Sequence, residues 1–310
     1  MRLDGLLAFP LTPFTRGDEV DLAAFGVHLE ALLAHQPSAL FVACGTGEFT
    51  GLSVAEWQMV VRTAATVVDG RIPVFAGVGG GPRIAREGID LAAAAGCDGV
   101  LLMPPYLVTA PPAGVLRHIA YVTDGSPLPV VVYQRDNARL DPTTVVGLLD
   151  LKSVIGLKDG VGDVDMMLRE VTAVRTSGHP RAAEFNFLNG LPTAELSVQA
   201  YEAIGVPSYS SAVLNFVPKL ATAFFRAVRA HDDATVQRLL ASFFLPFAAL
   251  RAQVPGYAVS LIKAGSRLAG ADLGGVRPPL VDPTPAHVAQ LGDIMAAGRA
   301  ALAAGPAAAR

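Results

Sequence analysis

Short apolar runs recur along the chain, and each is followed by a loop marked by glycine or proline. In most cases an alanine-rich stretch with helical spacing comes next. The eight runs are Leu6–Phe9, Ala39–Cys44, Ile72–Gly77, Gly99–Met103, Pro129–Tyr133, Val154–Lys158, Ala183–Leu188 and Val206–Ser211. Several are continuously apolar, which is typical of parallel strands buried on both faces. The pattern therefore predicts a series of strand–loop–helix units.

The segments between the runs carry helix signals. Val54–Val68 follows Ser53, a residue type that caps helices, and Pro82–Ala95 ends just before Gly96. Strands that alternate with helices form a parallel sheet, and eight units favour closure into a (β/α)8 TIM barrel of the α/β class. An open doubly wound sheet is the alternative, since the number of strands alone does not exclude it.

The strand pattern stops after about residue 215. Helical patterns follow over Ala221–Ala230, Asp233–Leu250 and Tyr257–Leu268, and a last one runs from Pro285 to about Ala303. We therefore expect a barrel over residues 1–220 and a C-terminal helical extension over residues 221–310. The extension is expected to pack on the barrel and on a neighbouring subunit.

Composition narrows the function classes. The chain of 310 residues exceeds a typical single domain, but a barrel of this type uses roughly 250 residues as one unit. Hydrophobic residues make up 52% of the chain, yet no uninterrupted apolar run reaches the roughly 20 residues of a membrane helix. The net charge is −3 and lysine and arginine do not cluster, so we expect neither a nucleic-acid nor a membrane partner.

The cysteines and histidines do not form a metal-binding pattern. Cys44 and Cys97 make neither a disulfide framework nor a zinc motif, and the six histidines lack H-x-H or H-E-x-x-H spacing. The amino terminus lacks the charged and apolar segments of a signal peptide. We therefore expect a protein of the reduced cytoplasm that uses no metal.

The chain has 20 arginines but only four lysines, and one of these, Lys158, closes the apolar run Val154–Lys158. In barrels of this kind the active site lies at the carboxyl ends of the strands. A lysine there has a poorly solvated ammonium, and desolvation lowers the pKa of a lysine. Because a partly neutral lysine attacks ketones, the position favours Schiff-base chemistry. The alternative is a strand-end lysine that simply reaches bulk water.

The second run ends in Gly45-Thr46-Gly47, where backbone amides and a hydroxyl can hold a carboxylate. The alternative is a tight turn. The third run continues into Gly77–Pro82, which lacks the G-x-G-x-x-G spacing of dinucleotide-binding loops, so we interpret it as a strand-to-helix turn.

Further polar side chains stand at the ends of the fifth, seventh and eighth runs. Tyr133 can relay a proton, and Arg135 can clamp a carboxylate in a bidentate manner. The alternatives are a tyrosine that caps the barrel and an arginine that pairs with Asp136. Asn189 and Ser210 offer polar groups to substrate hydroxyls, although small polar residues are common at strand ends without any function.

Together, Gly45-Thr46-Gly47-Glu48, Tyr133 and Lys158 resemble the Schiff-base lyases of the dihydrodipicolinate synthase / N-acetylneuraminate lyase superfamily, and the likeness spans the chain. Within the superfamily, the segments 133–138, 156–163 and 187–195 look like those of the 5-dehydro-4-deoxyglucarate dehydratases. The resemblance implies a (β/α)8 barrel, a homotetramer built as a dimer of dimers, and no metal or organic cofactor.

The resemblance also implies a substrate and roles for the site residues. The substrate is a small keto-dicarboxylic acid, 5-dehydro-4-deoxy-D-glucarate, which is dehydrated and decarboxylated to 2,5-dioxopentanoate. Lys158 forms the imine and Tyr133 transfers protons. Thr46 and the neighbouring backbone amides bind the ketoacid carboxylate, while Arg135 holds the other end.

Two positions depart from the synthases of the superfamily. Leu107 stands where they usually carry a second tyrosine, and Ala138 stands where they carry an arginine. Both differences count against lysine biosynthesis, and they leave open whether Tyr106 reaches a site. Two alternatives to a dehydratase remain. One is an aldolase of the same superfamily that releases or condenses pyruvate, and the other is a non-catalytic ligand-binding barrel.

Overall fold

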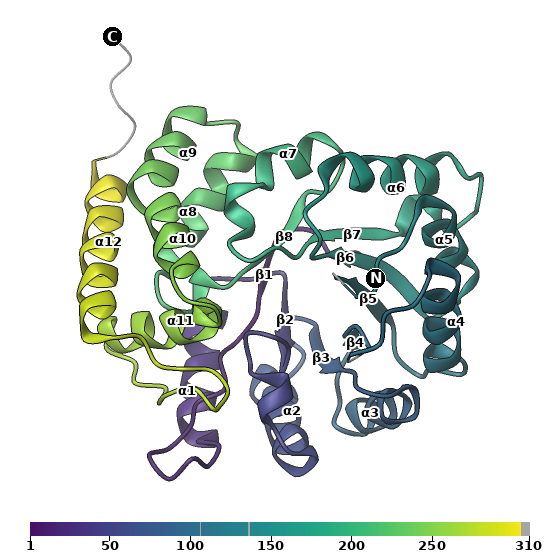
Figure 1. Ribbon diagram of the computed structural model, residues 1–310, viewed down its shortest axis with the longest axis horizontal. Coiled ribbons are helices and arrows are strands. Elements are labelled where there is room, and N and C mark those ends of the chain that lie inside the picture. Colours follow the sequence, from purple (N-terminus) through teal and green to yellow (C-terminus); the bar gives the residue numbers. More distant parts are fainter. Residues whose placement is uncertain (106, 136, 305–310) are drawn as a thin grey trace.

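Eight parallel strands form a closed barrel in which each strand pairs with the next along the chain and β8 pairs with β1 (Figure 1). The computed structural model describes residues 1–105, 107–135 and 137–304. The strands are β1 Leu6–Ala8, β2 Ala39–Val42, β3 Val74–Val78, β4 Gly99–Leu102, β5 Val130–Gln134, β6 Val154–Asp159, β7 Asn186–Asn189 and β8 Ser208–Ser211. The predicted (β/α)8 barrel is confirmed, and the open sheet is excluded.

A helix follows each strand and covers the outside of the barrel. These helices are α1 Leu22–Leu33, α2 Val54–Val68, α3 Pro82–Ala94, α4 Pro112–Thr123, α5 Pro142–Gly147, α6 Val164–Thr176, α7 Val198–Ala203 and α8 Pro218–Arg229. Short 3-10 turns stand at η1 Phe49–Gly51, η2 Leu148–Asp150, η3 Ala182–Glu184, η4 Ala194–Leu196 and η5 Val213–Asn215. The α2 helix begins where predicted because Ser53 and Glu56 form a capping box.

The C-terminal extension consists of α9 Asp233–Leu239, a π-helical segment Leu240–Phe244, α10 Leu245–Ala252, α11 Tyr257–Leu268 and α12 Pro285–Ala303. Its helices gather on one side of the barrel (Figure 1). The sequence predicted one helix over 233–250, but the π-helical segment interrupts it. The interruption lies just before Pro246, which has no N–H to donate to the Ser242 carbonyl. The expected boundary between residues 220 and 221 falls inside α8, the helix that follows β8.

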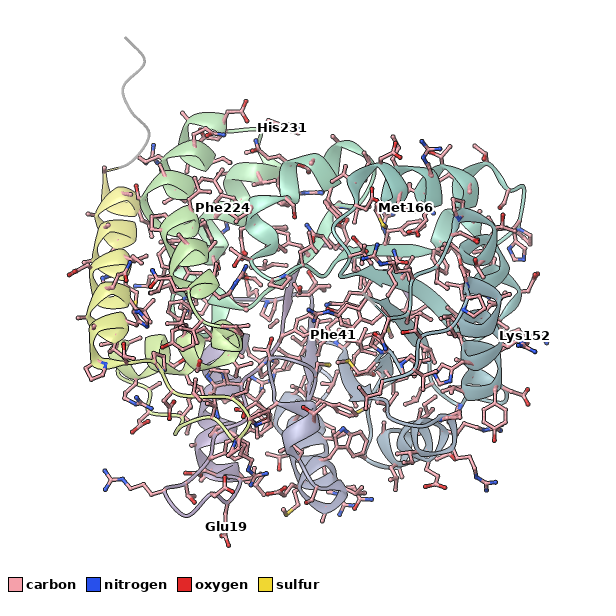
Figure 2. All side chains as sticks on the ribbon, viewed as in Figure 1. Glu19, Phe41, Lys152, Met166, Phe224 and His231 are labelled. Atoms are coloured by element: carbon pink, nitrogen blue, oxygen red, sulfur yellow. The ribbon has the colours of Figure 1, made fainter. Side chains whose placement is uncertain are left out.

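The barrel has an inner and an outer apolar core. Inside it, the rings of Phe9, Phe41 and Phe75 stack, with centroids 4.8 and 4.7 Å apart. Phe41 lies at the centre of the molecule, whereas Lys152 lies at its periphery (Figure 2). The outer core fills the space between strands and helices. In the described part of the chain, no helix combines the length and the apolar character needed to cross a membrane.

Candidate active site

A cavity of about 210 Å³ opens at the carboxyl ends of the strands. Strand ends contribute Phe9, Cys44, Tyr133, Lys158 and Ser210 to its walls, and the loop after β7 contributes Gly190–Thr193. The C-terminal extension closes another part of the wall with Phe247, Arg251, Ala258, Val259 and Ile262. The barrel and the extension therefore build this cavity together.

Lys158 is 4% exposed and stands next to last in β6. Its ammonium donates a hydrogen bond to the Gly190 carbonyl at 3.2 Å and lies 3.8 Å from the centre of the Tyr133 ring. The Phe9 ring is also near, with its centre 5.1 Å from Nζ. Within the described residues, the side chain thus meets two aromatic faces and one neutral acceptor, rather than the bulk water of the alternative interpretation.

The loop that follows β7 passes so close to Lys158 that it has no room for a side chain at position 190. A Cβ on Gly190 would lie 2.4 Å from Nζ and 2.6 Å from Cγ of Lys158. Nonbonded contacts of a Cβ atom are essentially never this short, so a side chain here would displace Lys158 or the loop. The loop backbone consequently lies directly against the amine.

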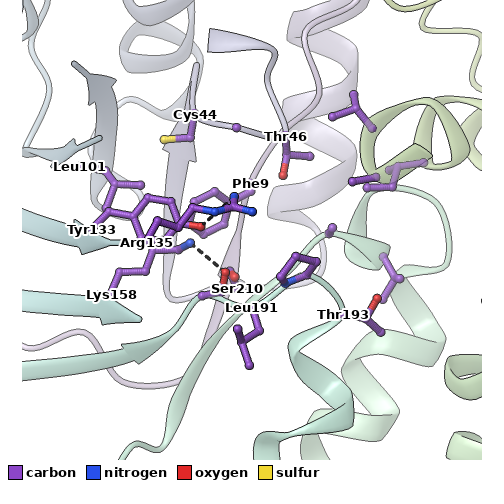
Figure 3. Close-up of a pocket in the computed structure, with 18 of the residues that line it drawn as sticks. Phe9, Cys44, Thr46, Leu101, Tyr133, Arg135, Lys158, Leu191, Thr193 and Ser210 are labelled. Carbon is purple, nitrogen blue, oxygen red and sulfur yellow. Dashed lines mark hydrogen bonds between the residues drawn. The ribbon is translucent and has the colours of Figure 1, made fainter. Parts of the chain in front are cut away.

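Tyr133 precedes the last residue of β5 and pairs in register with Lys158 on β6. Its hydroxyl accepts a hydrogen bond of 3.4 Å from Nη1 of Arg135, which is exposed at the rim. Figure 3 shows these three side chains together on one side of the cavity, with Thr193 on the other. Two residues raised by the sequence, Asp136 as a partner of Arg135 and Tyr106 as a site residue, lie outside the described residues.

The Gly45-Thr46-Gly47 turn contributes its first two residues to the cavity wall. Gly47 does not line the cavity, because it is buried against Ala43 and its carbonyl accepts a 2.7 Å hydrogen bond from the Thr12 hydroxyl. Ala43 and Glu48, on either side of the turn, have left-handed backbone conformations with φ of 48° and 57°. Such conformations cost energy and are concentrated at functional sites.

A buried ion pair connects the C-terminal extension to the Gly45-Thr46-Gly47 turn. Lys263 of α11 lies 2.7 Å from Glu48, and both side chains are almost fully buried. The backbone N–H of Arg277 also donates to Glu48, at 2.9 Å. Burial lowers the pKa of Lys263, and the adjacent Glu48 carboxylate opposes that effect. The left-handed Glu48 is therefore fixed by two residues from the far end of the chain.

Of the two strand-end candidates on β7 and β8, only Ser210 lines the cavity. Asn189 is fully buried, with its amide nitrogen donating to the Ser197 hydroxyl at 2.9 Å and its oxygen accepting from Leu191 N–H at 3.2 Å. In the sheet register Asn189 pairs with Asp159, while Leu188 pairs with Lys158. Since successive side chains of a strand alternate, Asn189 points away from the interior and organises the loop instead.

Sequence reasoning did not identify the contribution of the extension. Phe247 and Arg251 stand four residues apart on α10 and both line the cavity, as residues at this spacing share one helix face. The Arg251 guanidinium donates to the hydroxyl of Thr193. One signal in the sequence was available, because Arg251 interrupts an otherwise apolar helix, but its target depends on tertiary packing.

Three buried groups near the site have shifted proton affinities. Burial raises the pKa of Cys44 to about 12, although Lys158 lowers it, so the thiol in the cavity wall is not a thiolate nucleophile. Burial also raises the pKa of Glu195 to about 7, against a hydrogen bond from Ser211. Behind β6, burial raises the pKa of Glu170 to about 8, and the Gln134 amide, which donates to it at 2.9 Å, opposes this.

The fold and the cavity define a (β/α)8-barrel protein whose candidate site is built around a buried lysine at the end of β6. The family model of the dihydrodipicolinate synthetase family matches residues 2–297. The chain therefore belongs to this family.

Among curated relatives, the chain is 50% identical over 299 residues to a probable 5-dehydro-4-deoxyglucarate dehydratase of Streptomyces griseus, covering 96% of this chain and 93% of the relative. A probable 5-dehydro-4-deoxyglucarate dehydratase of Rhizobium rhizogenes is 45% identical, with 96% of both chains covered. Both relatives match along nearly their whole length.

Solved structures of the same fold are more distant in sequence. Dihydrodipicolinate synthase from Oceanobacillus iheyensis gives a TM-score of 0.88 at 23% identity, covering 96% of this chain and 97% of that one. YagE, a prophage protein of the family from E. coli K12 solved in complex with pyruvate, gives 0.85 at 25% identity, covering 96% and 98%. The helical extension is included in this likeness, because the matched region covers nearly the whole chain.

Proposed function

We propose that the protein is a Schiff-base lyase that converts 5-dehydro-4-deoxy-D-glucarate into 2,5-dioxopentanoate, CO₂ and water. The observation that carries the proposal is the buried Lys158 amine, which faces the cavity between the Tyr133 ring and the Gly190 carbonyl. The names of the curated relatives support the dehydratase over an aldolase. The pyruvate complex of YagE supports 2-ketoacid chemistry in this fold.

In the proposed first half of the reaction, Lys158 in its neutral form attacks the C5 ketone, and the carbinolamine loses water to give a protonated imine. The imine is an electron sink, so a proton leaves C4 as an enamine forms. The enamine electrons then expel the C3 hydroxyl, which takes up a proton and departs as water. The product of this half is an iminium conjugated with a C3–C4 double bond.

In the second half, the C1–C2 bond breaks and releases CO₂, and its electron pair moves through the conjugated system to the imine nitrogen. Protonation at C4 and conversion of the C2 enol into an aldehyde follow, with a proton added at C3. Hydrolysis of the imine consumes one water and frees Lys158. One water and one CO₂ are released in total, so the equation balances.

The remaining residues have proposed roles that follow from their positions. Tyr133 transfers protons, since its hydroxyl is on the side chain that covers the amine. Thr46 and the amide of Gly45 bind the carboxylate next to the ketone. Ser210 contacts a substrate hydroxyl. Gly47 and Asn189, which do not line the cavity, support the turn and the loop that do.

We extend the proposal to the quaternary structure and the cellular compartment of the protein. The barrel, placed from the sequence at residues 1–220, is completed by the rest of α8, and the helical extension follows it. A homotetramer in the cytoplasm is the functional unit. Large apolar side chains at the strand-end face support a subunit interface: Leu107 is 83% exposed, Ile84 60% and Val108 55%. Light scattering coupled to size-exclusion chromatography tests this, and a monomer at micromolar concentration would contradict it.

The decisive experiment is a product assay with 5-dehydro-4-deoxy-D-glucarate that follows CO₂ and 2,5-dioxopentanoate together. Release of both in equal amounts supports the proposal, whereas pyruvate without CO₂ indicates an aldolase. Intact-mass measurement after borohydride reduction should show one substrate-derived adduct on the wild-type protein and none on Lys158→Ala. A protein that forms no adduct with any 2-ketoacid is a ligand-binding barrel rather than a Schiff-base enzyme.

A further inference from the structure

The cavity wall contains a half-buried arginine that the proposed reaction does not use. Arg251 is half-buried on α10 and lines the cavity. Its hydrogen-bond partner is the neutral hydroxyl of Thr193, and among the described residues no carboxylate forms an ion pair with it. Burial lowers its pKa, and the charge of nearby Glu195 opposes this only in part. Buried charges are normally paired, so this guanidinium has donors to offer to an anion that enters the cavity.

Lys158 and Arg251 are bound to the same short loop. Lys158 donates to the carbonyl of Gly190, and Arg251 donates to the side chain of Thr193, three residues later. A segment of this length spans at most roughly 10 Å. Four bonds of about 1.5 Å join the imine carbon of a six-carbon keto-diacid to its far carboxylate carbon, and in the extended chain they span roughly 5 Å. Both cations also line the same cavity, so an acid bound to Lys158 extends along a wall that carries the Arg251 guanidinium.

Thr193 is held in an unfavourable backbone conformation at this point. It has φ 52° and ψ 59°, which is rare for a β-branched residue, and its side chain is buried. Strained conformations of this kind persist where the surrounding structure fixes them for a purpose. Here the consequence is that the hydroxyl meets the Arg251 guanidinium and fixes its direction at the cavity wall.

Arg135, the arginine expected from the sequence to hold the far end, is placed differently. It is exposed at the rim, and its Nη1 donates to the Tyr133 hydroxyl, on the same side as the amine. Solvent weakens the attraction of an exposed arginine for a carboxylate, whereas a half-buried one attracts it more strongly. Of the two cavity arginines, Arg251 is therefore better placed to recognise a second carboxylate.

We propose that Arg251, oriented by Thr193, binds the carboxylate farthest from the ketone and makes the site selective for keto-dicarboxylic acids. This inference rests on the proposed function. A cation beside the departing carboxylate stabilises the bound substrate at least as much as the transition state, in which this carboxylate loses its charge, so Arg251 acts in recognition rather than in bond breaking. Its loss should raise KM much more than it lowers kcat.

The test compares two ligands of equal length that form an imine but cannot eliminate water: 2-oxohexanedioate, which has the far carboxylate, and 2-oxohexanoate, which does not. The borohydride-trapped adduct is measured by intact mass against ligand concentration. Arg251→Gln should raise the half-saturating concentration of the diacid roughly ten- to hundredfold, as expected for a lost charge-assisted bond, and that of the monoacid less than about threefold. Arg251→Lys, which keeps the charge, should recover part of the selectivity.

Arg135→Gln is the matched control, because it removes the same group from the rim of the same cavity. It should reduce the diacid preference less than Arg251→Gln does. The inference is overturned if Arg251→Gln and Arg251→Lys both keep the wild-type preference, or if Arg135→Gln alone abolishes it. If the wild-type protein forms no adduct with either acid, the Schiff-base function itself is wrong. If both acids are trapped without preference, only the inference about Arg251 is wrong.

Discussion

The Lys158 ammonium lies over the face of the Tyr133 ring, 3.8 Å from its centre, while the hydroxyl of the same tyrosine accepts a hydrogen bond from Arg135 at 3.4 Å. The ring and the hydroxyl therefore have different partners. The ring positions the amine through a contact worth about 0.5–2 kcal/mol, and the hydroxyl is the part that can exchange a proton.

This division predicts different results for two substitutions of Tyr133. Tyr133→Phe keeps the ring and should keep borohydride-trapped adduct formation within a few-fold of the wild type. It should lower turnover of the dehydration by roughly 10²–10⁴, the range for loss of a general acid–base group. Tyr133→Leu should weaken both. Equal loss of trapping and turnover in Tyr133→Phe would show that the hydroxyl already acts in imine formation.

Gly190→Ala tests the closeness of the loop to the amine. The added Cβ would lie 2.4 Å from Nζ of Lys158 and 2.8 Å from the Asp159 carbonyl, so either the lysine or the loop must move. We expect adduct formation to fall at least tenfold and the melting temperature to drop. Gly17→Ala is the control, since its Cβ would approach only Thr15 Oγ1, at 3.6 Å. Normal trapping by Gly190→Ala would mean that the loop yields easily.

Glu170→Gln tests the buried carboxyl behind β6, whose protonation makes the stability of the folded protein depend on pH. Burial raises its pKa to about 8 in the folded protein, so between roughly pH 4.5 and 8 the folded state holds a proton that the unfolded state has released. Wild-type stability therefore falls as pH rises through this range, and Glu170→Gln should not show this loss.

Chemical denaturation at pH 5, 7 and 9 measures the difference for Glu170→Gln. Between pH 5 and 9, the free energy of unfolding of the variant should rise relative to that of the wild type by a few kcal/mol, since a tenfold change in proton affinity corresponds to about 1.4 kcal/mol. At pH 5 the Glu170 carboxyl of the folded wild type is protonated and the amide of the variant is uncharged. The two folded proteins then carry the same charge at this position, so pH 5 serves as the internal reference. Parallel stability profiles at all three pH values would contradict the assignment.

Lys263→Met tests the ion pair that connects the extension to the turn after β2. Because it leaves the Glu48 carboxylate buried without its partner, we expect a loss of about 3–5 kcal/mol in the free energy of unfolding. The double variant Glu48→Gln/Lys263→Met removes both charges and should recover at least half of that loss. Lys152→Met, at an exposed position, should change stability by less than about 0.5 kcal/mol. Equal losses in the free energy of unfolding for Lys152→Met and Lys263→Met would show that the ion pair does not stabilise the protein.

Much of the fold could be predicted from the sequence, because buried parallel strands and capped helices leave local patterns. Every predicted strand has its counterpart in the barrel, and Tyr257–Leu268 has the predicted bounds. The interruption at Leu240–Phe244 was missed, since the apolar pattern continues through it and Pro246 was its only local sign. A helix pattern records which face is buried but not how each turn is bonded.

The site could be predicted only in part, for geometric reasons. Strand order brings Tyr133 and Lys158 together, so placing both at strand ends was sufficient to make them neighbours. Asn189 stands one position beyond the inward-facing Leu188, and the alternation of the strand turns it outward. Arg251 stands more than ninety positions beyond Lys158 in the sequence, on α10, and no local pattern predicts which loop such a helix will meet.

The π segment has a consequence for how this protein can change over generations. Each turn of a π-helix takes up about one residue more than a turn of an α-helix, so loss of one residue between Leu240 and Phe244 would restore an α-helical turn and leave Phe247 and Arg251 facing the cavity. The cavity wall therefore tolerates a deletion in this segment, whereas a substitution at Arg251 would change the proposed selectivity without altering Lys158 in β6. The proposed selectivity and the proposed reactivity are thus separately heritable in this chain.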